Sequence, residues 1–310
     1  MAVNIRVALL NYPESLKSAL FGLQEMLLVA NRCAEEQGLS ARFNSQLLDW
    51  ADVAESTPGF DLVVLPPSYQ GQFYQQPDVS LLRWLRAQHQ QGAVLASACA
   101  GAFLLAASGV CTSKTLTTHW ALEPAFRQQF PKVALNTNAI LLDEQDIISA
   151  GGMMSWVDLG LELVTRFMSA SVMRQVGKVL VIDTAPREQR FYQQFSPDFR
   201  HGDELVLTVQ KRMADGFRDE LSVAALAAGV HVSQRTLLRR FEKATSLTPL
   251  LYLQRLRIQK VCDQLESSTQ SFERIAFQVG YQDISACRKA FVRIMGLTPK
   301  AFRQRFAQRG

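Results

Sequence analysis

Ser233-Gln-Arg-Thr-Leu-Leu-Arg-Arg-Phe241 and Asp283-Ile-Ser-Ala-Cys-Arg-Lys-Ala-Phe291 are two copies of one pattern, and they decide the fold of the C-terminal third. Leu-Thr-Pro follows each copy, at 247–249 and at 297–299, with the same offset of 50 residues. A short apolar segment precedes each copy. Internal repetition on this scale is typical of a duplicated supersecondary unit. The pattern therefore predicts a helix, a tight turn and a second helix, made twice.

The second helix of each copy is expected to be amphipathic. In the first copy Leu237 and Phe241 recur at helical spacing on one side, whereas Arg235 and Arg239 lie on the other. The apolar positions of the second copy are Ile284, Cys287, Phe291 and Ile294. Ser233 and Asp283 are residue types that cap helix N-termini well. A capped helix with an outward basic face is the arrangement of a helix-turn-helix that reads DNA.

Residue type also indicates what each outward position could contact. Small side chains allow close approach to base edges and thymine methyl groups, whereas Arg can bind guanine or phosphate. The residues expected to contact DNA are Ser233, Gln234, Arg235, Thr236, Arg239, Lys243, Ser285, Ala286, Arg288, Lys289 and Arg293. A merely solvated charged face is the alternative for one amphipathic helix, but duplication with matching caps favours DNA reading.

The positive charge of the chain is concentrated in the same region. From Asp203 to Gly310 there are 18 Lys and Arg against 10 Asp and Glu, a net charge of +8. The whole chain carries +5, so residues 1–202 carry −3. This asymmetry is typical of one domain that attracts phosphate and a second domain that is nearly neutral.

Residues about 220–306 resemble the AraC/XylS family of bacterial transcription regulators. The resemblance rests on the two copies, on Pro249 with Tyr252 and Arg257, and on Gly296-Leu-Thr-Pro299 with Phe302. It implies two helix-turn-helix units joined by a long helix, here Pro249 to about Ser268. It also implies that both reading helices enter successive major grooves, about one helical turn (~34 Å) apart.

The first two thirds of the chain have an α/β pattern. Buried-type runs at residues 4–10, 61–65, 93–96 and 146–149 are each followed by a turn and a helical pattern, which indicates a mainly parallel sheet. Helices are expected at 16–37, 79–91, 101–108, 121–130 and 156–166. The predicted fold is a flavodoxin-like α/β domain with flanking helices, followed by an all-α domain with two helix-turn-helix units.

Cys99 lies where one of these strands turns directly into a helix, in Val94-Leu-Ala-Ser-Ala-Cys99-Ala-Gly-Ala-Phe103. A cysteine at such a turn could be a strained, exposed nucleophile, and a helix N-terminus would favour its thiolate. Cysteine is also among the most buried residue types, and small neighbours are what close strand-to-helix packing requires. The pattern alone leaves both readings open.

Residues about 4–185 resemble the PfpI-type, class I glutamine-amidotransferase-like domain. The resemblance rests on the Cys99 segment, Thr117-Thr-His-Trp120 and Ser149-Ala-Gly-Gly152. Joined to an AraC-type tail, this is the arrangement of the GlxA-like regulators. Catalytic members pair the cysteine with a following histidine and an acid on the first helix; here these positions hold Ala100 and Ala19. No catalytic residue is therefore expected, and Cys99, Ala100 and His119 are candidates for a ligand pocket instead.

Length and composition predict two domains and a cytoplasmic protein. At 310 residues and 48% hydrophobic the chain can build two cores, and no apolar run is long enough to span a membrane. Five cysteines without metal-like spacing argue against disulfides and zinc, and neither a metal nor a cofactor is expected. The expected division is a sensing and dimerisation domain at 1–185, a linker at 186–204 and a DNA-binding domain at 205–310.

Three functional hypotheses follow. The first is a transcription regulator, expected from the resemblance to be an activator, with double-stranded DNA, an unknown small-molecule effector, a second copy of the chain and RNA polymerase as its partners. The second is a cysteine-dependent hydrolase or amidase tethered to DNA, which the missing base at position 100 disfavours. The third is a structural interaction module, which would show no salt-sensitive binding to duplex DNA.

Overall fold

The structure, a computed structural model, describes residues 3–53, 59–185 and 187–307. The chain divides into two compact units, Met1–Gln189 and Arg190–Gly310. Residue 186, in the expected linker, lies outside the described residues. The helices and strands of the N-terminal unit are β1 (Val3–Asn11), α1 (Lys17–Glu36), β2 (Ala41–Asp49), β3 (Leu62–Leu65), α2 (Gln72–Gln75), α3 (Val79–Gln90), β4 (Val94–Ala98), α4 (Gly101–Ser108), β5 (Thr115–Leu116), α5 (Glu123–Gln129), β6 (Ala134–Leu135), β7 (Leu141–Asp143), β8 (Ile147–Ala150), α6 (Trp156–Phe167) and α7 (Ala170–Leu180).

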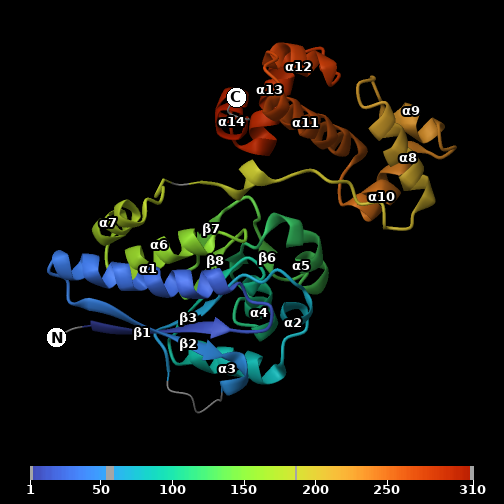
Figure 1. The fold of residues 1–310 in the computed structure, drawn as a ribbon. Coiled ribbons are helices and arrows are strands. Elements are labelled where there is room, and N and C mark those ends of the chain that lie inside the picture. Colours follow the sequence, from blue (N-terminus) through green and yellow to red (C-terminus); the bar gives the residue numbers. More distant parts are fainter. Residues whose placement is uncertain (1–2, 54–58, 186, 308–310) are drawn as a thin grey trace. The chain divides into compact units, whose positions relative to one another are not determined.

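A six-stranded sheet forms the centre of the N-terminal unit. Its order is β2-β1-β3-β4-β8-β7, and every neighbouring pair is parallel except β7 with β8. Helices cover both faces, so that the sheet is the middle of three layers (Figure 1). Alternate residues of β1 serve the two faces: Val7 and Leu9 pack with α1, α6 and α7, whereas Ala8 and Leu10 pack with α3, α4 and α5. The predicted α/β fold with a mainly parallel sheet is confirmed.

Strand β2 was not predicted, and its position explains why. It lies at the edge of the sheet and pairs with β1 along all nine residues, yet only Phe43 within it is buried. A continuous apolar run marks strands that are buried on both faces, and an edge strand does not need one. The four predicted strands correspond to β1, β3, β4 and β8.

The C-terminal unit is helical. Its helices are α8 (Glu204–Asp215), α9 (Val223–Ala228), α10 (Gln234–Thr245), α11 (Pro249–Ser267), α12 (Phe272–Gln278), α13 (Ile284–Met295) and α14 (Pro299–Phe306). Two helix-turn-helix units, α9 with α10 and α12 with α13, are the predicted repeats, and α11 joins them (Figure 1). The prediction of an all-α domain with two such units is confirmed.

Each repeat has its own core. The first core is centred on Phe241 and also contains Leu226, Leu237 and Tyr252, together with residues of α8. The second core contains Ile258, Val261, Leu265, Ile275, Val279, Cys287, Phe291 and Phe302. Helix α11 contributes Tyr252 to the first core and the residues from Ile258 onward to the second, so it is the helix that the two cores share.

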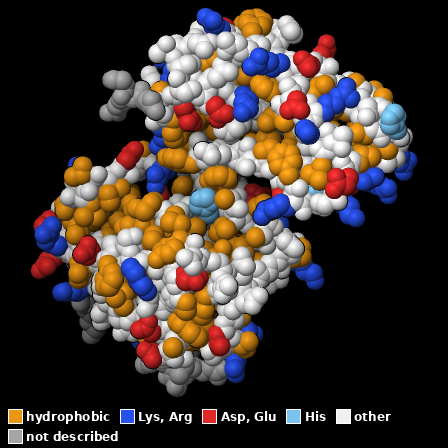
Figure 2. Space-filling view, turned by 45° about the vertical axis from the view of Figure 1, so that its right-hand side comes forward, with side chains coloured by type: hydrophobic (Ala, Val, Ile, Leu, Met, Phe, Trp, Pro, Cys, Tyr) orange, Lys and Arg blue, Asp and Glu red, His pale blue; other side chains and the backbone are white. Residues whose placement is uncertain are grey.

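Figure 2 shows hydrophobic side chains on one face of the N-terminal unit. Phe21 and Leu28 on α1 are exposed hydrophobic residues of this unit, with exposed fractions of 52% and 58%. Because the two residues are seven positions apart, which is about two helical turns, they lie on the same side of α1. In the described ranges every helix is too short or too polar to cross a membrane.

Candidate nucleic-acid interface and the Cys99 turn

Side-chain caps begin both candidate reading helices. The Ser233 hydroxyl accepts a hydrogen bond from the Thr236 backbone N–H at 3.2 Å at the start of α10. The Asp283 carboxylate accepts one from the Ser285 backbone N–H at 2.7 Å at the start of α13. Each cap satisfies one of the N–H groups that have no partner within the helix. The N-termini of both helices are thereby fixed at equivalent positions in the two repeats.

The outward face of α10 is polar and basic. Leu237 and Phe241 are fully buried on the inner side of the helix. The exposed candidates on the outer side are Gln234, Arg235, Arg239 and Lys243, and Thr236 is half-buried against Ser233. Within the described chain, none of the three cations on this face takes part in an ion pair. Their charges are available to an external anion.

The outward face of α13 differs, because the protein itself holds two of its cations. The Arg288 guanidinium lies 3.2 Å from the Glu273 carboxylate and 4.7 Å from the ring centroid of Phe272. Arg293 donates a hydrogen bond to the Gln254 side chain. The remaining exposed candidates are Ser285, Ala286 and Lys289. Small residues and one lysine therefore dominate the accessible part of this face.

Arg240, which was not among the predicted interface residues, has a positioning role. Its guanidinium makes two hydrogen bonds, of 2.9 and 2.6 Å, to the carboxylate of Asp203, the N-cap of α8. Hydrogen bonding from Arg240 is the main cause that lowers the pKa of Asp203. The ion pair fastens α10 to α8. The sequence placed Asp203 in the expected linker, 186–204, and gave no indication of this pair.

Cys99 sits at a strained turn between β4 and α4. Its φ of +53° is unusual for a residue with a side chain, and Thr118 Oγ1 donates to its carbonyl at 2.7 Å. Two residues later, a Cβ at Gly101 would lie 2.5 Å from the Leu65 carbonyl oxygen, so only glycine allows α4 to approach β3 so closely. Cys99 therefore occupies a strained strand-to-helix turn, and its burial bears on the choice between an exposed and a buried thiol that the sequence left open.

The electrostatics of the turn do not favour a nucleophile. Cys99 is 2% exposed, and burial raises the pKa of its thiol to about 12, although hydrogen bonds from the backbone of Ala100 and His119 oppose the shift. Burial outweighs the helix N-terminus that was expected to favour the thiolate. His119 lies near Cys99, since its backbone N–H donates a hydrogen bond to the thiol. The His119 ring lies 5.3 Å from that of Trp120. Burial lowers the pKa of His119, so its imidazole is neutral at pH 7.

The three candidate pocket residues therefore come together around one turn. Ala100 is fully buried, as is Ala19, which occupies the position expected for a catalytic acid. Glu14 precedes α1, with a φ of +64° and with a buried Oε2 that has no hydrogen-bond partner within the described chain. Among the described residues, no group of three or more His, Cys, Asp or Glu side chains could hold a metal ion.

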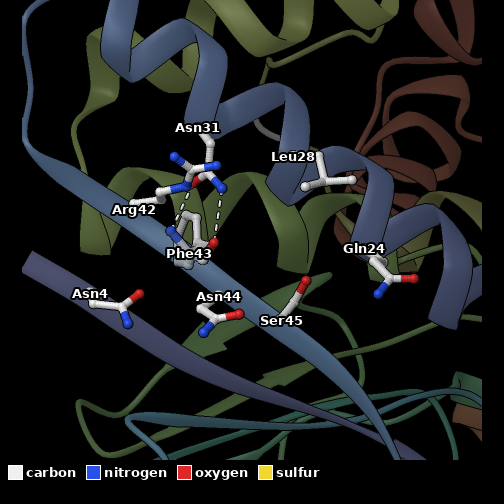
Figure 3. Close-up of a pocket in the computed structure, with 8 residues that line it drawn as sticks. All are labelled: Asn4, Gln24, Leu28, Asn31, Arg42, Phe43, Asn44 and Ser45. Carbon is white, nitrogen blue, oxygen red and sulfur yellow. Dashed lines mark hydrogen bonds between the residues drawn. The ribbon is translucent and has the colours of Figure 1, made fainter.

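A separate groove of about 350 Å³ opens between α1 and the edge strand β2 (Figure 3). It is lined by Asn4, Gln24, Leu28, Asn31, Arg42, Phe43, Asn44 and Ser45. The Asn31 carboxamide donates to the Phe43 carbonyl and accepts from the Phe43 N–H, both at 2.8 Å. Neither Cys99 nor His119 lines this groove, so it is distinct from the turn.

Comparisons with known proteins agree with this division of the chain. A model described as a helix-turn-helix domain matches residues 226–305, and the DJ-1/PfpI family model matches residues 23–166. A crystal structure of a transcriptional regulator protein from Vibrio parahaemolyticus, described as putative, has a TM-score of 0.50 and 19% identity, and covers 57% of this chain and 99% of its own. At that identity the likeness concerns the fold alone.

Two curated relatives match both parts of the chain. The HTH-type transcriptional regulator GbdR of Pseudomonas aeruginosa is 25% identical over 71% of this chain and 60% of its own length. The HTH-type transcriptional regulator GlxA of Rhizobium meliloti is 26% identical over 71% of this chain and 68% of its own. The match thus spans about three fifths of the length of GbdR. With the repeats, the caps and the Cys99 turn, these likenesses show that the chain is similar to AraC-family helix-turn-helix regulators that carry a DJ-1/PfpI-type N-terminal domain.

Proposed function

We propose that this chain is a sequence-specific DNA-binding transcriptional regulator of the cytoplasm, with α10 and α13 as its reading helices. The observation that carries the proposal is the pair of equivalent, capped helices, of which α10 exposes cations that pair with no carboxylate of the described residues. A helix of this kind can place its N-terminal residues in the major groove. The positive excess of the same unit supplies attraction to phosphate.

The first test is selection of random duplex DNA by the full-length protein at physiological salt. Recovery of a motif with two blocks about ten base pairs apart is expected, because two reading helices one helical turn apart cover adjacent major-groove segments. Enrichment of no motif, with binding that salt abolishes equally for all sequences, would overturn the proposal.

Substitution of two neighbouring cations on α10 can distinguish recognition of bases from general attraction to phosphate. Arg239→Ala should cost about 1–3 kcal/mol at one base step, because Arg can bind guanine through two hydrogen bonds. Lys243→Ala, one turn later on the same face, should weaken all duplexes alike. Competition binding with the selected motif and a scrambled duplex measures both. Equal losses on the two duplexes for Arg239→Ala would refute the base-contact role.

We also propose that the N-terminal unit joins two copies of the chain. The exposed pair Phe21 and Leu28 on α1 supports this, because apolar residues on one helix side are what a second copy would cover. Leu28→Glu should shift the chain toward monomer in sedimentation equilibrium, whereas Leu39→Glu, at a position 40% exposed outside α1, should not. An unchanged mass for Leu28→Glu would remove α1 from the interface.

We propose that the same unit senses a small-molecule effector at the turn formed by Cys99, Ala100 and His119, and that the response is activation through RNA polymerase. Binding would change regulation only if the effector prefers one state of the protein over the other. Screening small molecules for a shift in thermal stability of the wild type, but not of a Cys99→Leu variant, would test the site.

We do not propose hydrolase chemistry at Cys99, because a thiol with its pKa near 12 stays protonated at neutral pH, and Ala100 stands where catalytic PfpI-type members carry a histidine. Iodoacetamide should therefore modify Cys99 no faster than the similarly buried Cys111 at pH 7. Mass spectrometry of the labelled peptides gives the two rates. Fast, selective modification of Cys99 at pH 6 would revive the enzyme hypothesis.

A further inference from the structure

The two helix-turn-helix repeats are joined by more than α11. Residues Arg190–Phe195, here called the strap, begin within η3 (Gln189–Tyr192), precede α8 in the chain and contact both repeats. Sequence patterns predicted only a polar linker here. The contacts of the strap within the C-terminal unit give it a different role.

One end of the strap packs on the second repeat. The Arg305 guanidinium of α14 lies 5.5 Å from the Phe191 ring centroid and 5.9 Å from that of Tyr192. The Tyr192 ring also packs edge-on against Phe306 at 5.5 Å. Arg190 lies against the C-terminal end of α13, since a Cβ added at Gly296 would be 2.2 Å from its Nε. These contacts tie the strap to the second reading helix and to its neighbour.

The other end packs on the first repeat. The Phe195 ring lies edge-on to Tyr252 at 5.1 Å, and Tyr252 in turn lies edge-on to Phe241 of α10 at 5.3 Å. The Phe195 backbone N–H donates to the Gln259 side chain of α11 at 2.8 Å. Phe195 is thus part of the first core, one ring away from the first reading helix.

The two ends are only three residues apart. A fully extended chain gains at most 3.3–3.6 Å per residue, so Tyr192 and Phe195 can be separated by roughly 10 Å and no more. The two repeats also meet at α11 and at Phe217, which lies between α8 and α9 and packs against the second core. Rotation of one repeat about α11 would still have to pull one aromatic anchor of the strap out of its site. The strap is therefore a short connection that adds to α11 and to the Phe217 contact in limiting this rotation.

We propose that the strap sets the distance and angle between α10 and α13, and so determines which spacing of the two DNA blocks the protein accepts. This inference rests on the proposed DNA-reading function. Tyr192 and Phe195 act as positioning residues, since neither needs to touch DNA. A protein with loosened anchors would keep both reading helices but tolerate wrong spacings.

The experiment uses full-length protein and a set of duplexes in which the two selected blocks are separated by successive numbers of base pairs. The wild type should bind one spacing best. For the wild type, changing the spacing by two base pairs should lower the affinity. In Tyr192→Ala and Phe195→Ala this loss of affinity should be at least threefold smaller. The affinity of both variants for the best spacing should change by less than threefold. Phe199→Ala, 50% exposed and beyond the strap, is the matched control and should keep the wild-type profile.

Each outcome of the spacing experiment either supports or overturns the proposed role of the strap. A spacing profile of Tyr192→Ala and Phe195→Ala that equals the wild type would overturn the role of the strap and leave DNA reading intact. Absence of any two-block motif for the wild type would overturn both proposals. Tyr192 is 38% exposed, so its truncation should not prevent folding even if the Phe195 variant proves unstable. Circular dichroism at 222 nm confirms that each variant retains its helices.

Discussion

The two repeats of the C-terminal unit share their internal design and differ on their outer faces. Phe241 packs edge-on against Tyr252, and Phe291 packs edge-on against Phe302, at 5.3 and 5.5 Å. On the outer faces, Arg235, Arg239 and Lys243 of α10 form no ion pair within the described part of the chain, whereas Arg288 on α13 lies near Glu273. Packing is therefore duplicated and surface chemistry is not. Under the proposed function, we expect the first repeat to supply more of the attraction to DNA and the second to offer small residues for close approach.

The strongest test of the shared design is removal of each central ring. Phe241→Ala and Phe291→Ala should each lower the free energy of unfolding of the C-terminal unit by about 3–5 kcal/mol, because both rings are fully buried. All four tryptophans, Trp50, Trp84, Trp120 and Trp156, belong to the N-terminal unit, so a loss of helical dichroism without a change in tryptophan fluorescence isolates the C-terminal transition.

A cost below about 1 kcal/mol for one of the two variants would mean that the repeats are not equivalent in packing. Exposed Phe277→Ala, also in the C-terminal unit, serves as the control and should be nearly neutral.

Substitutions at the C-terminal ends of the two reading helices should change the free energy of unfolding in opposite directions. Both α10 and α13 end in a left-handed residue, Ser246 with φ of +57° and Gly296 with φ of +72°. Gly296→Ala should destabilise by about 1–2 kcal/mol, since it adds backbone strain and a clash with Arg190. Ser246→Gly should stabilise by about 0.5–1 kcal/mol, because glycine adopts this conformation without penalty. Thermal denaturation followed at 222 nm gives both signs, and destabilisation by Ser246→Gly would contradict the account.

The difference between the outer faces should appear in the salt dependence of DNA binding. Lys243→Ala should reduce the slope of log K against log salt by about one, because an unpaired cation releases a counterion from the duplex. Arg288→Ala should reduce it by less, since Arg288 already has Glu273 as a partner. Titrations at several salt concentrations measure the slopes. A larger reduction for Arg288→Ala would reverse the ranking of the two repeats.

The smallest expected effect is on the stability of the fold at acidic pH. The pKa of Asp203 is lowered, chiefly by hydrogen bonding from Arg240, so the carboxylate stabilises the fold above its unfolded pKa of about 3.9 and loses that contribution as pH falls through the lower folded value. Asp203→Asn keeps a capping residue but removes the charge, and it should flatten the fall of the melting temperature between pH 5 and pH 3. Glu273→Gln should flatten it less, because that pair is about half exposed. Identical acid profiles for wild type and Asp203→Asn would refute this role.

The repeats could be predicted from the sequence because each carries its own signals: a cap, apolar residues at helical spacing, and Leu-Thr-Pro at the end. The partners of Arg288 and Arg293 could not, since α12 and α11 reach them only through the tertiary fold. The contacts of the strap escaped prediction for the same reason: a polar, proline-containing segment resembles a linker until its aromatic residues meet their partners.

In the N-terminal unit the sequence located the strained turn at Cys99 but not its electrostatics. Small residues around a cysteine are compatible with an exposed thiol and with a sealed one, and only the packing of α4 against the sheet decides between them. The edge strand β2 escaped prediction because its residues are mostly polar and its pairing with β1 is made by the backbone.

The hydrogen bonds of Asn31 have a consequence for how crowded molecules behave. An edge strand as long as β2 offers its backbone to any extended segment of another molecule, which is the usual start of aggregation into intermolecular sheets. Asn31 occupies the N–H and C=O of Phe43, so a foreign strand cannot form an uninterrupted ladder along this edge. We therefore expect the Asn31 carboxamide to hinder strand pairing between N-terminal units of different molecules at high concentration.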